Sequence, residues 1–308
     1  MNWICLPLAV IVLSAAFPKP AIAASPAQAP TPVHDRQFWR DLAKNHYAIP
    51  PDQSAAALAT ELSANLASPD PELRDDLAYS IFYVWIVRQN KFSPADLVTL
   101  LDQWESNLRI GIGESRTDTV FLRSFSALCL ATLAERDLKS PFFGEQRFRS
   151  LLTRSLEYLH DERDLRGFDP VKGWIHSAAH TADLLAFLAA NPLLKLEDQS
   201  RILQGVSQRL SSAQLIFSYG EQDRLANTIA IIVARQDFDA AAFKNWLYAL
   251  NESDRNVWKN SPPNGMLLMT YQNNSYMLQS LAARLYSQPK SPAATAALDQ
   301  VTQILQKR

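Results

Sequence analysis

Apolar residues recur at helical spacing in one segment after another from His34 to the C-terminus. Short polar connections separate these segments, and no alternating pattern is long enough to predict a strand. Glycine is scarce, with 8 residues among 308, which disfavours a turn-rich β protein. We therefore predict an all-α fold with helices over residues 34–47, 52–68, 70–90, 93–109, 117–137, 144–164, 174–188, 196–212, 221–236, 239–253, 274–288 and 291–308.

A weak internal period suggests how these helices are arranged. Arg74 and Arg123 stand about 49 residues apart on similar helices, and Arg224 follows after about twice that distance, near the repeat length of HEAT and armadillo proteins. A helix pair cannot bury both its faces alone, whereas stacked pairs share one elongated core. The pattern favours stacked antiparallel helix pairs in a HEAT/armadillo-like α-solenoid, with an irregular α/α bundle as the alternative.

The segment GWIHSAAHTAD, residues 173–183, carries the strongest candidate site. On a helix with 3.6 residues per turn, His176, His180 and Asp183 share one face. The other positions are mostly Ala, Leu, Ile and Trp, which is typical of a buried helix. A buried polar group without a partner costs about 1–3 kcal/mol. These three side chains must therefore meet polar neighbours, a ligand or a metal ion.

Three interpretations of this stripe stay open. His176 and His180, four residues apart, place two imidazoles on one divalent ion, zinc or iron, with Asp183 as a third ligand. Without a metal, Asp183 orients one histidine for acid–base catalysis. In the third interpretation the three side chains only fix the register of neighbouring helices. The HExxH protease motif is excluded, because residue 177 is Ser.

A charged segment precedes this helix. Glu162 and Asp164, together with His160, are positioned to complete a metal site if the segment folds back over the helix. Arg163 and Arg166 either neutralise those carboxylates or bind an anion between them. The alternative is a solvated helix end. The candidate polar groove thus comprises His176, His180, Asp183, Glu162, Asp164 and Arg166.

The N-terminus is typical of an export signal. The apolar run WICLPLAVIVLSAAF precedes Ala21-Ile22-Ala23, which fits cleavage before Ala24. This run is shorter than the roughly 20 residues that span a bilayer, so stable membrane insertion is not expected. We predict a signal peptide over residues 1–23, a Pro/Ala-rich tether over 24–33 and a single all-α domain over 34–308. A short N-terminal anchor is the alternative.

Charge and motifs narrow the function further. The formal net charge is −1 and no cluster of Lys and Arg resembles a nucleic-acid-binding patch, which excludes nucleic acid as a partner. The sequence contains no G-x-S-x-G, P-loop or G-x-G-x-x-G motif. Cys129 lies in an apolar helical run, where a lone cysteine packs as a small hydrophobe.

Three segments carry a family resemblance: DPELRDDLAYSIFYVWI (70–86), TDTVFLRSFSALCLATL (117–133) and ERDLRGFDPVKGWIHSAAHTADLL (162–185). Together they resemble the bacterial family catalogued as domain of unknown function 2785. The resemblance spans about Leu58 to Leu250 and is most specific over 162–185. It implies a helical domain, no established activity and no catalytic residues to transfer.

These observations predict an exported helical-repeat protein, periplasmic or extracytoplasmic, that binds or scaffolds a protein or small-molecule ligand. The ligand is expected in the polar groove around His176, His180 and Asp183. The alternative is a metal-dependent hydrolase that uses the same stripe, in which the ion activates a bound water.

Overall fold

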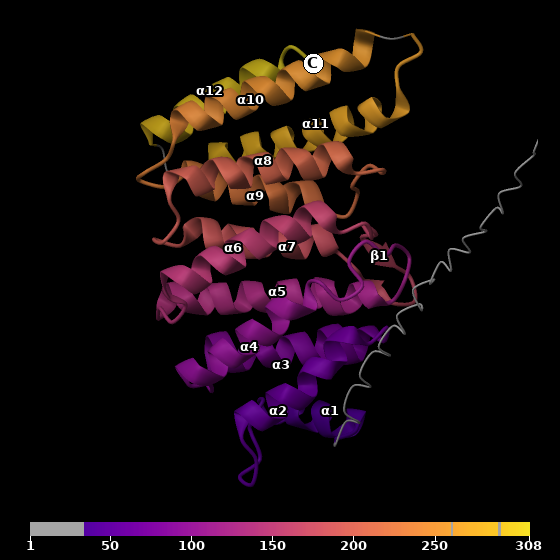
Figure 1. Cartoon of the computed structure of the whole chain (residues 1–308), viewed down its shortest axis with the longest axis vertical. Coiled ribbons are helices and arrows are strands. Elements are labelled where there is room, and N and C mark those ends of the chain that lie inside the picture. The colour runs from indigo at the N-terminus through magenta and orange to yellow at the C-terminus, as the bar shows by residue number, and fades with distance from the viewer. Residues whose placement is uncertain (1–33, 260, 289–290) are drawn as a thin grey trace, which may run out of the picture. The chain divides into compact units, whose positions relative to one another are not determined.

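The structure is a computed structural model that describes residues 34–259, 261–288 and 291–308 (Figure 1). Most of these residues are helical, and the two strands among them have two residues each, which confirms the all-α prediction. The predicted signal peptide and tether lie outside the described residues. The α-helices are α1 (Arg36–Lys44), α2 (Ala55–Leu62), α3 (Ser80–Tyr83), α4 (Pro94–Asn107), α5 (Thr119–Lys139), α6 (Gly144–Asp161), α7 (Ser177–Ala190), α8 (Leu196–Ser212), α9 (Glu221–Val233), α10 (Ala240–Arg255), α11 (Gly265–Ser287) and α12 (Pro292–Leu305).

Shorter elements complete the fold. Two 3₁₀ helices are η1 (Ser63–Ala67) and η4 (Asn256–Lys259), and two strands of two residues each, β1 (Phe168–Asp169) and β2 (Gly173–Trp174), pair antiparallel. The predicted helix over 70–90 is a continuous helical segment from Glu72 to Arg88, in which π-helical η2 (Glu72–Tyr79) and η3 (Val84–Arg88) flank α3.

Local sequence sets several helix boundaries. Ser93 caps α4, because its side chain accepts a hydrogen bond from Asp96 N while the Asp96 carboxylate accepts one from Ser93 N. The predicted start of α11 at residue 274 is too late. Asn264 caps this helix by accepting hydrogen bonds from the first-turn amides of Met266 and Leu267, and so moves its start to Gly265.

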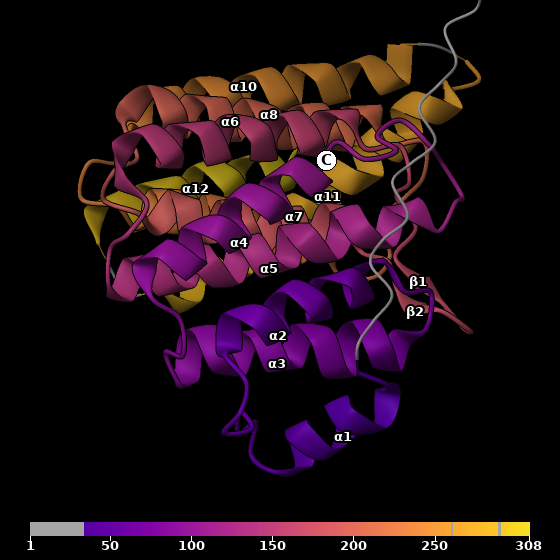
Figure 2. The same ribbon diagram turned by 60° about the horizontal axis from the view of Figure 1, so that its bottom comes forward.

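The helices from α4 onward form two packed rows (Figures 1 and 2). In one row α5, α7, α9 and α11 pack each against the next, and in the other α6 lies beside α8 and α8 beside α10. Helix α4 packs on α5, α6 on α7, and α12 covers α11 and α10. The loops that precede α5, α7 and α9 contact one another at the edge that also carries β1 and β2.

One large cluster of buried apolar side chains runs through the described helices from α1 to α12. Its bulkiest members include Trp85 and Trp104, both fully buried, and Trp104 packs edge-on against Phe82 with ring centroids 4.9 Å apart. Cys129 belongs to this cluster, and burial raises the pKa of its thiol well above the usual value. Within the described residues, no helix is both long and apolar enough to cross a membrane.

Candidate functional site

A short hairpin precedes α7 and changes where the helical part of the histidine stripe begins, because the prediction had started this helix at Trp174. In the structure Gly173 and Trp174 form β2, and α7 starts only at Ser177. The amides of Ile175 and His176 both donate to Gly167 O, at 2.9 and 3.3 Å. These bonds hold the backbone in the hairpin, so His176 becomes the N-cap residue, with a left-handed φ of 47°.

His176 is held by the loop that precedes α9. Its side chain is only 4% exposed, its Nε2–H donates to Tyr219 O at 3.0 Å, and its ring stacks on Trp174 with centroids 4.3 Å apart. Glu221 Oε1 lies 3.8 Å from Nε2, beyond hydrogen-bond distance. Burial, assisted by the positive charge of Arg224, lowers the pKa of His176 to about 4. The imidazole is therefore neutral at pH 7.

His180 lies one turn further along α7 and faces α5. Its Nδ1 is 2.9 Å from Ser124 Oγ, and Ser124 Oγ itself donates to Ile175 O. The ring meets the rings of His176 and Phe125 edge-on, with centroids 5.7 and 5.0 Å away. Burial, with a smaller effect from His176, lowers the pKa of His180 well below its usual value. Both histidines thus act as neutral hydrogen-bonding groups at the junction of three helices.

Asp183 is the exposed end of the stripe. Its carboxylate pairs with Arg224 of α9, and 26% of the side chain remains exposed. Burial raises the pKa of Asp183, although the nearby Arg224 opposes this shift. The side chain lines a cavity of about 480 Å³ that is formed by residues of η2, α3, α5, α7 and α9. The lining residues are Tyr79, Tyr83, Leu128, Ala131, Thr132, Glu135, Leu138, Asp183, Ala186, Phe187, Ala190, Asn227 and Ile231.

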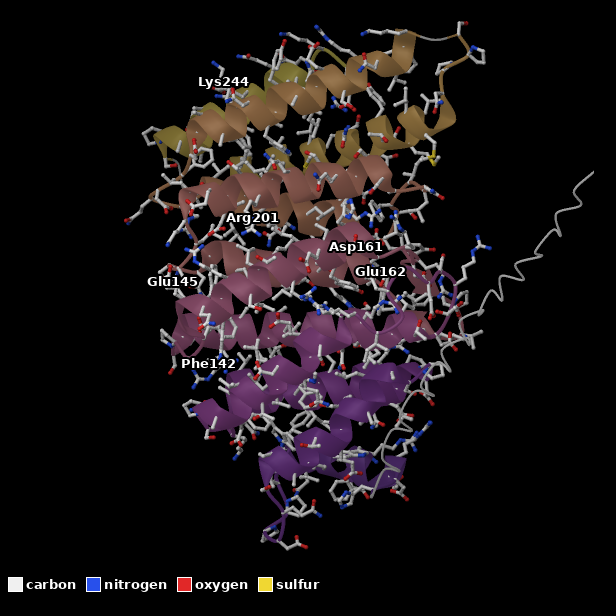
Figure 3. All side chains as sticks on the ribbon, viewed as in Figure 1. Phe142, Glu145, Asp161, Glu162, Arg201 and Lys244 are labelled. Carbon is white, nitrogen blue, oxygen red and sulfur yellow. The ribbon has the colours of Figure 1, made fainter. Side chains whose placement is uncertain are left out.

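Glu162 belongs to a different cluster from the histidines. It is buried at the end of α6, beside Asp161 in Figure 3, and accepts hydrogen bonds from Arg123 Nε at 2.6 Å and Nη2 at 3.1 Å. Arg123 is completely buried and also donates to Ile110 O at 2.8 Å. Asp164 N donates to Glu162 Oε1 at 2.9 Å. The Glu162 carboxylate therefore neutralises a buried arginine.

Asp164 and Arg166 form the next pair along the segment. The Asp164 carboxylate is 1% exposed and accepts from Arg166 Nε at 2.8 Å and Nη2 at 2.6 Å. It also accepts from Arg116 N at 2.8 Å, which ties the loop before α5 to the loop before α7. His160 stays on the surface and pairs with Asp161. Among the described residues, no hydrogen bond joins the Glu162 or Asp164 carboxylate to His176 or His180.

Several residues that hold this region together were not predicted to belong to the site. Arg74 is fully buried, donates to Lys172 O at 2.6 Å and Trp174 O at 3.1 Å, and lies 4.0 Å from the centre of the Phe121 ring. Burial lowers the pKa of Arg74 to about 10, which leaves it charged at neutral pH. The only signal for Arg74 in the sequence was its spacing of about 49 residues from Arg123. Nothing in the sequence marked Tyr219 as the partner of His176.

The candidate metal ligands all have other partners. His176 Nε2 is bonded to Tyr219 O, His180 Nδ1 to Ser124, and Asp183 to Arg224. Across residues 34–259, 261–288 and 291–308, no group of three or more His, Cys, Asp or Glu side chains is arranged to hold a metal ion. What the site offers in this arrangement is a buried polar junction that opens, at Asp183, onto a cavity.

Comparison with known proteins identifies the family. Residues 108–283, more than half of the chain, match the model of a family described as "Protein of unknown function (DUF2785)". The chain therefore belongs to this family, which confirms the resemblance, although the match begins and ends later than expected. No curated protein and no solved structure matches the chain.

Proposed function

We propose that this chain, a member of the DUF2785 family, is an exported binding protein with HEAT-like stacked helix pairs. Its ligand occupies the cavity beside Asp183. The observation that carries this proposal is the cavity itself: the helical segment of η2 and α3, together with α5, α7 and α9, which pack each against the next, contributes to one hollow, as expected for a binding surface built across stacked helices. Its volume of about 480 Å³ falls in the usual range for small-molecule sites.

The lining of this cavity selects a type of ligand. Tyr79, Tyr83 and Phe187 provide aromatic surface, while Asp183 and Glu135 provide carboxylates. The described lining contains no Lys or Arg, although Arg224 and Lys139 pair with these two carboxylates from outside the lining. Aromatic faces and carboxylates both attract positive charge. A larger cavity of about 580 Å³ lies between α8 and α10. Its described lining contains no charged residue, so it has no group that would attract a cation. We infer that the ligand has an apolar body and a positive charge, such as an aromatic amine.

Removing the Asp183 charge tests this proposal. Phenethylamine should bind in isothermal titration calorimetry, whereas 2-phenylethanol, which lacks the charge, should bind more weakly. Asp183→Asn should weaken amine binding about tenfold, the loss of roughly 1.4 kcal/mol expected for one charge-assisted contact. Glu157→Gln is the matched control, because Glu157 is an exposed carboxylate on α6 outside the cavity. Equal binding of amine and alcohol, or no effect of Asp183→Asn, would contradict the proposal.

The alternative function is a metal-dependent hydrolase that uses His176, His180 and Asp183. The close approach of the two imidazoles, 5.7 Å between centroids, favours it. Metal binding would require Asp183 to leave Arg224. Elemental analysis of untagged protein separates the two functions. Stoichiometric zinc or iron that disappears in the double variant His176→Ala with His180→Ala would support the hydrolase and argue against a metal-free binding protein.

Export rests on the first residues of the sequence. The apolar run and the Ala21-Ile22-Ala23 pattern support cleavage before Ala24. Protein recovered from the periplasm of an expressing bacterium should therefore begin at Ala24 when its N-terminus is determined. An intact Met1 on protein confined to the cytoplasm would contradict export.

A further inference from the structure

A second cavity lies on the loops that connect the two rows. Its volume is about 340 Å³, and it is formed by the loop before α5, the segment between α6 and α7, and the end of α8 with the loop that follows. The lining residues are Ser115, Arg116, Arg163, Asp164, Leu165, Arg166, Arg209, Ser212, Gln214 and Leu215. Four of these residues are arginines and one is an acid, so the lining carries a clear excess of positive charge.

Two of the four arginine side chains have no polar partner in the described part of the chain. The side chains of Arg116 and Arg163 are exposed and make no hydrogen bond or ion pair with the residues that the structure describes. Asp164 does not neutralise them, because its carboxylate already accepts two hydrogen bonds from Arg166 and one from Arg116 N. Two guanidinium groups thus remain available at one cavity.

Arg209 adds a buried charge to the same cavity. It is 1% exposed, and its Nη1 donates to Leu159 O at 3.0 Å and Glu162 O at 2.8 Å. Its Nε is buried and has no hydrogen-bond partner among the residues that the structure describes. Burial, and then the like charge of Arg163, lower the pKa of Arg209 to about 10. A buried, incompletely paired cation next to another cation is stabilised by an anion nearby.

We propose that this cavity binds the phosphoryl group of a small phosphorylated molecule. Guanidinium groups bind phosphate through paired, charge-assisted hydrogen bonds. Ser115, Ser212 and Gln214 bring further hydrogen-bond donors to the same lining. A volume of about 340 Å³ is at the lower end of the range for small-molecule sites, and it leaves room for a small organic part beside the phosphoryl group. This site is separate from the cavity beside Asp183, and either can fail without the other.

Calorimetric titration with inorganic phosphate and with glycerol 3-phosphate tests the site. Both should bind with a stoichiometry of one, the ester more tightly, whereas glycerol and succinate should not bind measurably. Arg163→Ala should weaken binding of both phosphate compounds at least tenfold, and Arg116→Ala together with Arg163→Ala should weaken it further. These exposed residues are preferred to Arg209, whose removal leaves backbone carbonyls unpaired.

Lys244→Ala is the matched control, because it also removes one exposed positive charge, from α10 and remote from Glu162 in Figure 3. Its affinity for phosphate should stay within twofold of the native protein. Circular dichroism of each variant checks that the fold is retained. The proposal is overturned if neither phosphate compound binds at millimolar concentration, if Arg163→Ala binds as tightly as the native protein, or if succinate binds as well as glycerol 3-phosphate.

Discussion

Glu162→Ala is expected to lower the free energy of unfolding by about 3–5 kcal/mol, because it leaves a buried guanidinium without its counter-charge. Arg123 is completely buried, and two of its nitrogens donate to Glu162, so water cannot replace the lost carboxylate. The Ile110 carbonyl that would remain carries no net charge. Urea unfolding followed by circular dichroism measures the effect at neutral pH.

Two further variants isolate the cause of that loss. Glu157→Ala removes a carboxylate from the same helix, but its ion pair with Arg154 is at the surface, where such pairs contribute about 0–1 kcal/mol. Arg123→Leu combined with Glu162→Leu should lose less stability than Glu162→Ala alone, since no buried charge is left unpaired. If Glu162→Ala and Glu157→Ala have the same effect, the buried ion pair does not stabilise the fold as described.

His176→Asn is expected to make the protein less sensitive to acid. The pKa of His176 is about 4 in the folded protein, below the value of about 6.5 in an unfolded chain, so the unfolded chain binds more protons between these values. The stability that neutral His176 contributes is present above pH 6.5 and is lost as the pH falls toward 4. From about pH 7.5 to about pH 4.5, the native protein should lose about 2.5 kcal/mol more than the variant.

Asparagine is chosen because it tolerates the left-handed backbone at this position and does not titrate. The carboxyls of Asp183 and Glu221, whose pKa values burial raises, act in the opposite sense as the pH falls, but they are present in both proteins. Ser177→Ala is the control: it removes the hydrogen bond to Asp164 O without removing a titrating group, so its cost should be equal at both pH values. A pH profile of His176→Asn parallel to that of the native protein would contradict the assignment.

The stripe has two ends with different environments. At the hairpin end, His176 and His180 are sealed beneath Trp174 and Tyr219 and against α5. At the other end, Asp183 opens onto a cavity. The two ends differ in their burial. Burial keeps the two imidazoles neutral, whereas the Asp183 carboxylate is partly exposed and pairs with Arg224. A chemical role for the whole stripe would need a ligand to reach both ends, whereas binding at Asp183 needs only the exposed end.

The helical class and most helix positions were determined by the sequence alone. Apolar periodicity acts over a few residues, and so do caps such as Ser93, so local sequence suffices to predict them. The family was also identified from the sequence, and two of the three segments that carried the resemblance, 117–133 and 162–185, lie within the matched residues 108–283. The sequence also singled out His176, His180 and Asp183 as polar groups that needed partners.

The partners themselves were decided only by the tertiary structure. Tyr219 reaches His176 across 43 residues, Arg123 reaches Glu162 across 39, and Arg74 reaches Trp174 across 100. The hairpin that displaces His176 from the helix depends on the same long-range packing, because Arg74 and Ser124 bond its carbonyls. Hydrogen bonds and ion pairs between distant segments have no periodic signature in the chain. Only the packing of the two helix rows brings those segments together, and it thereby decides which charges are neutralised and which remain open to a ligand.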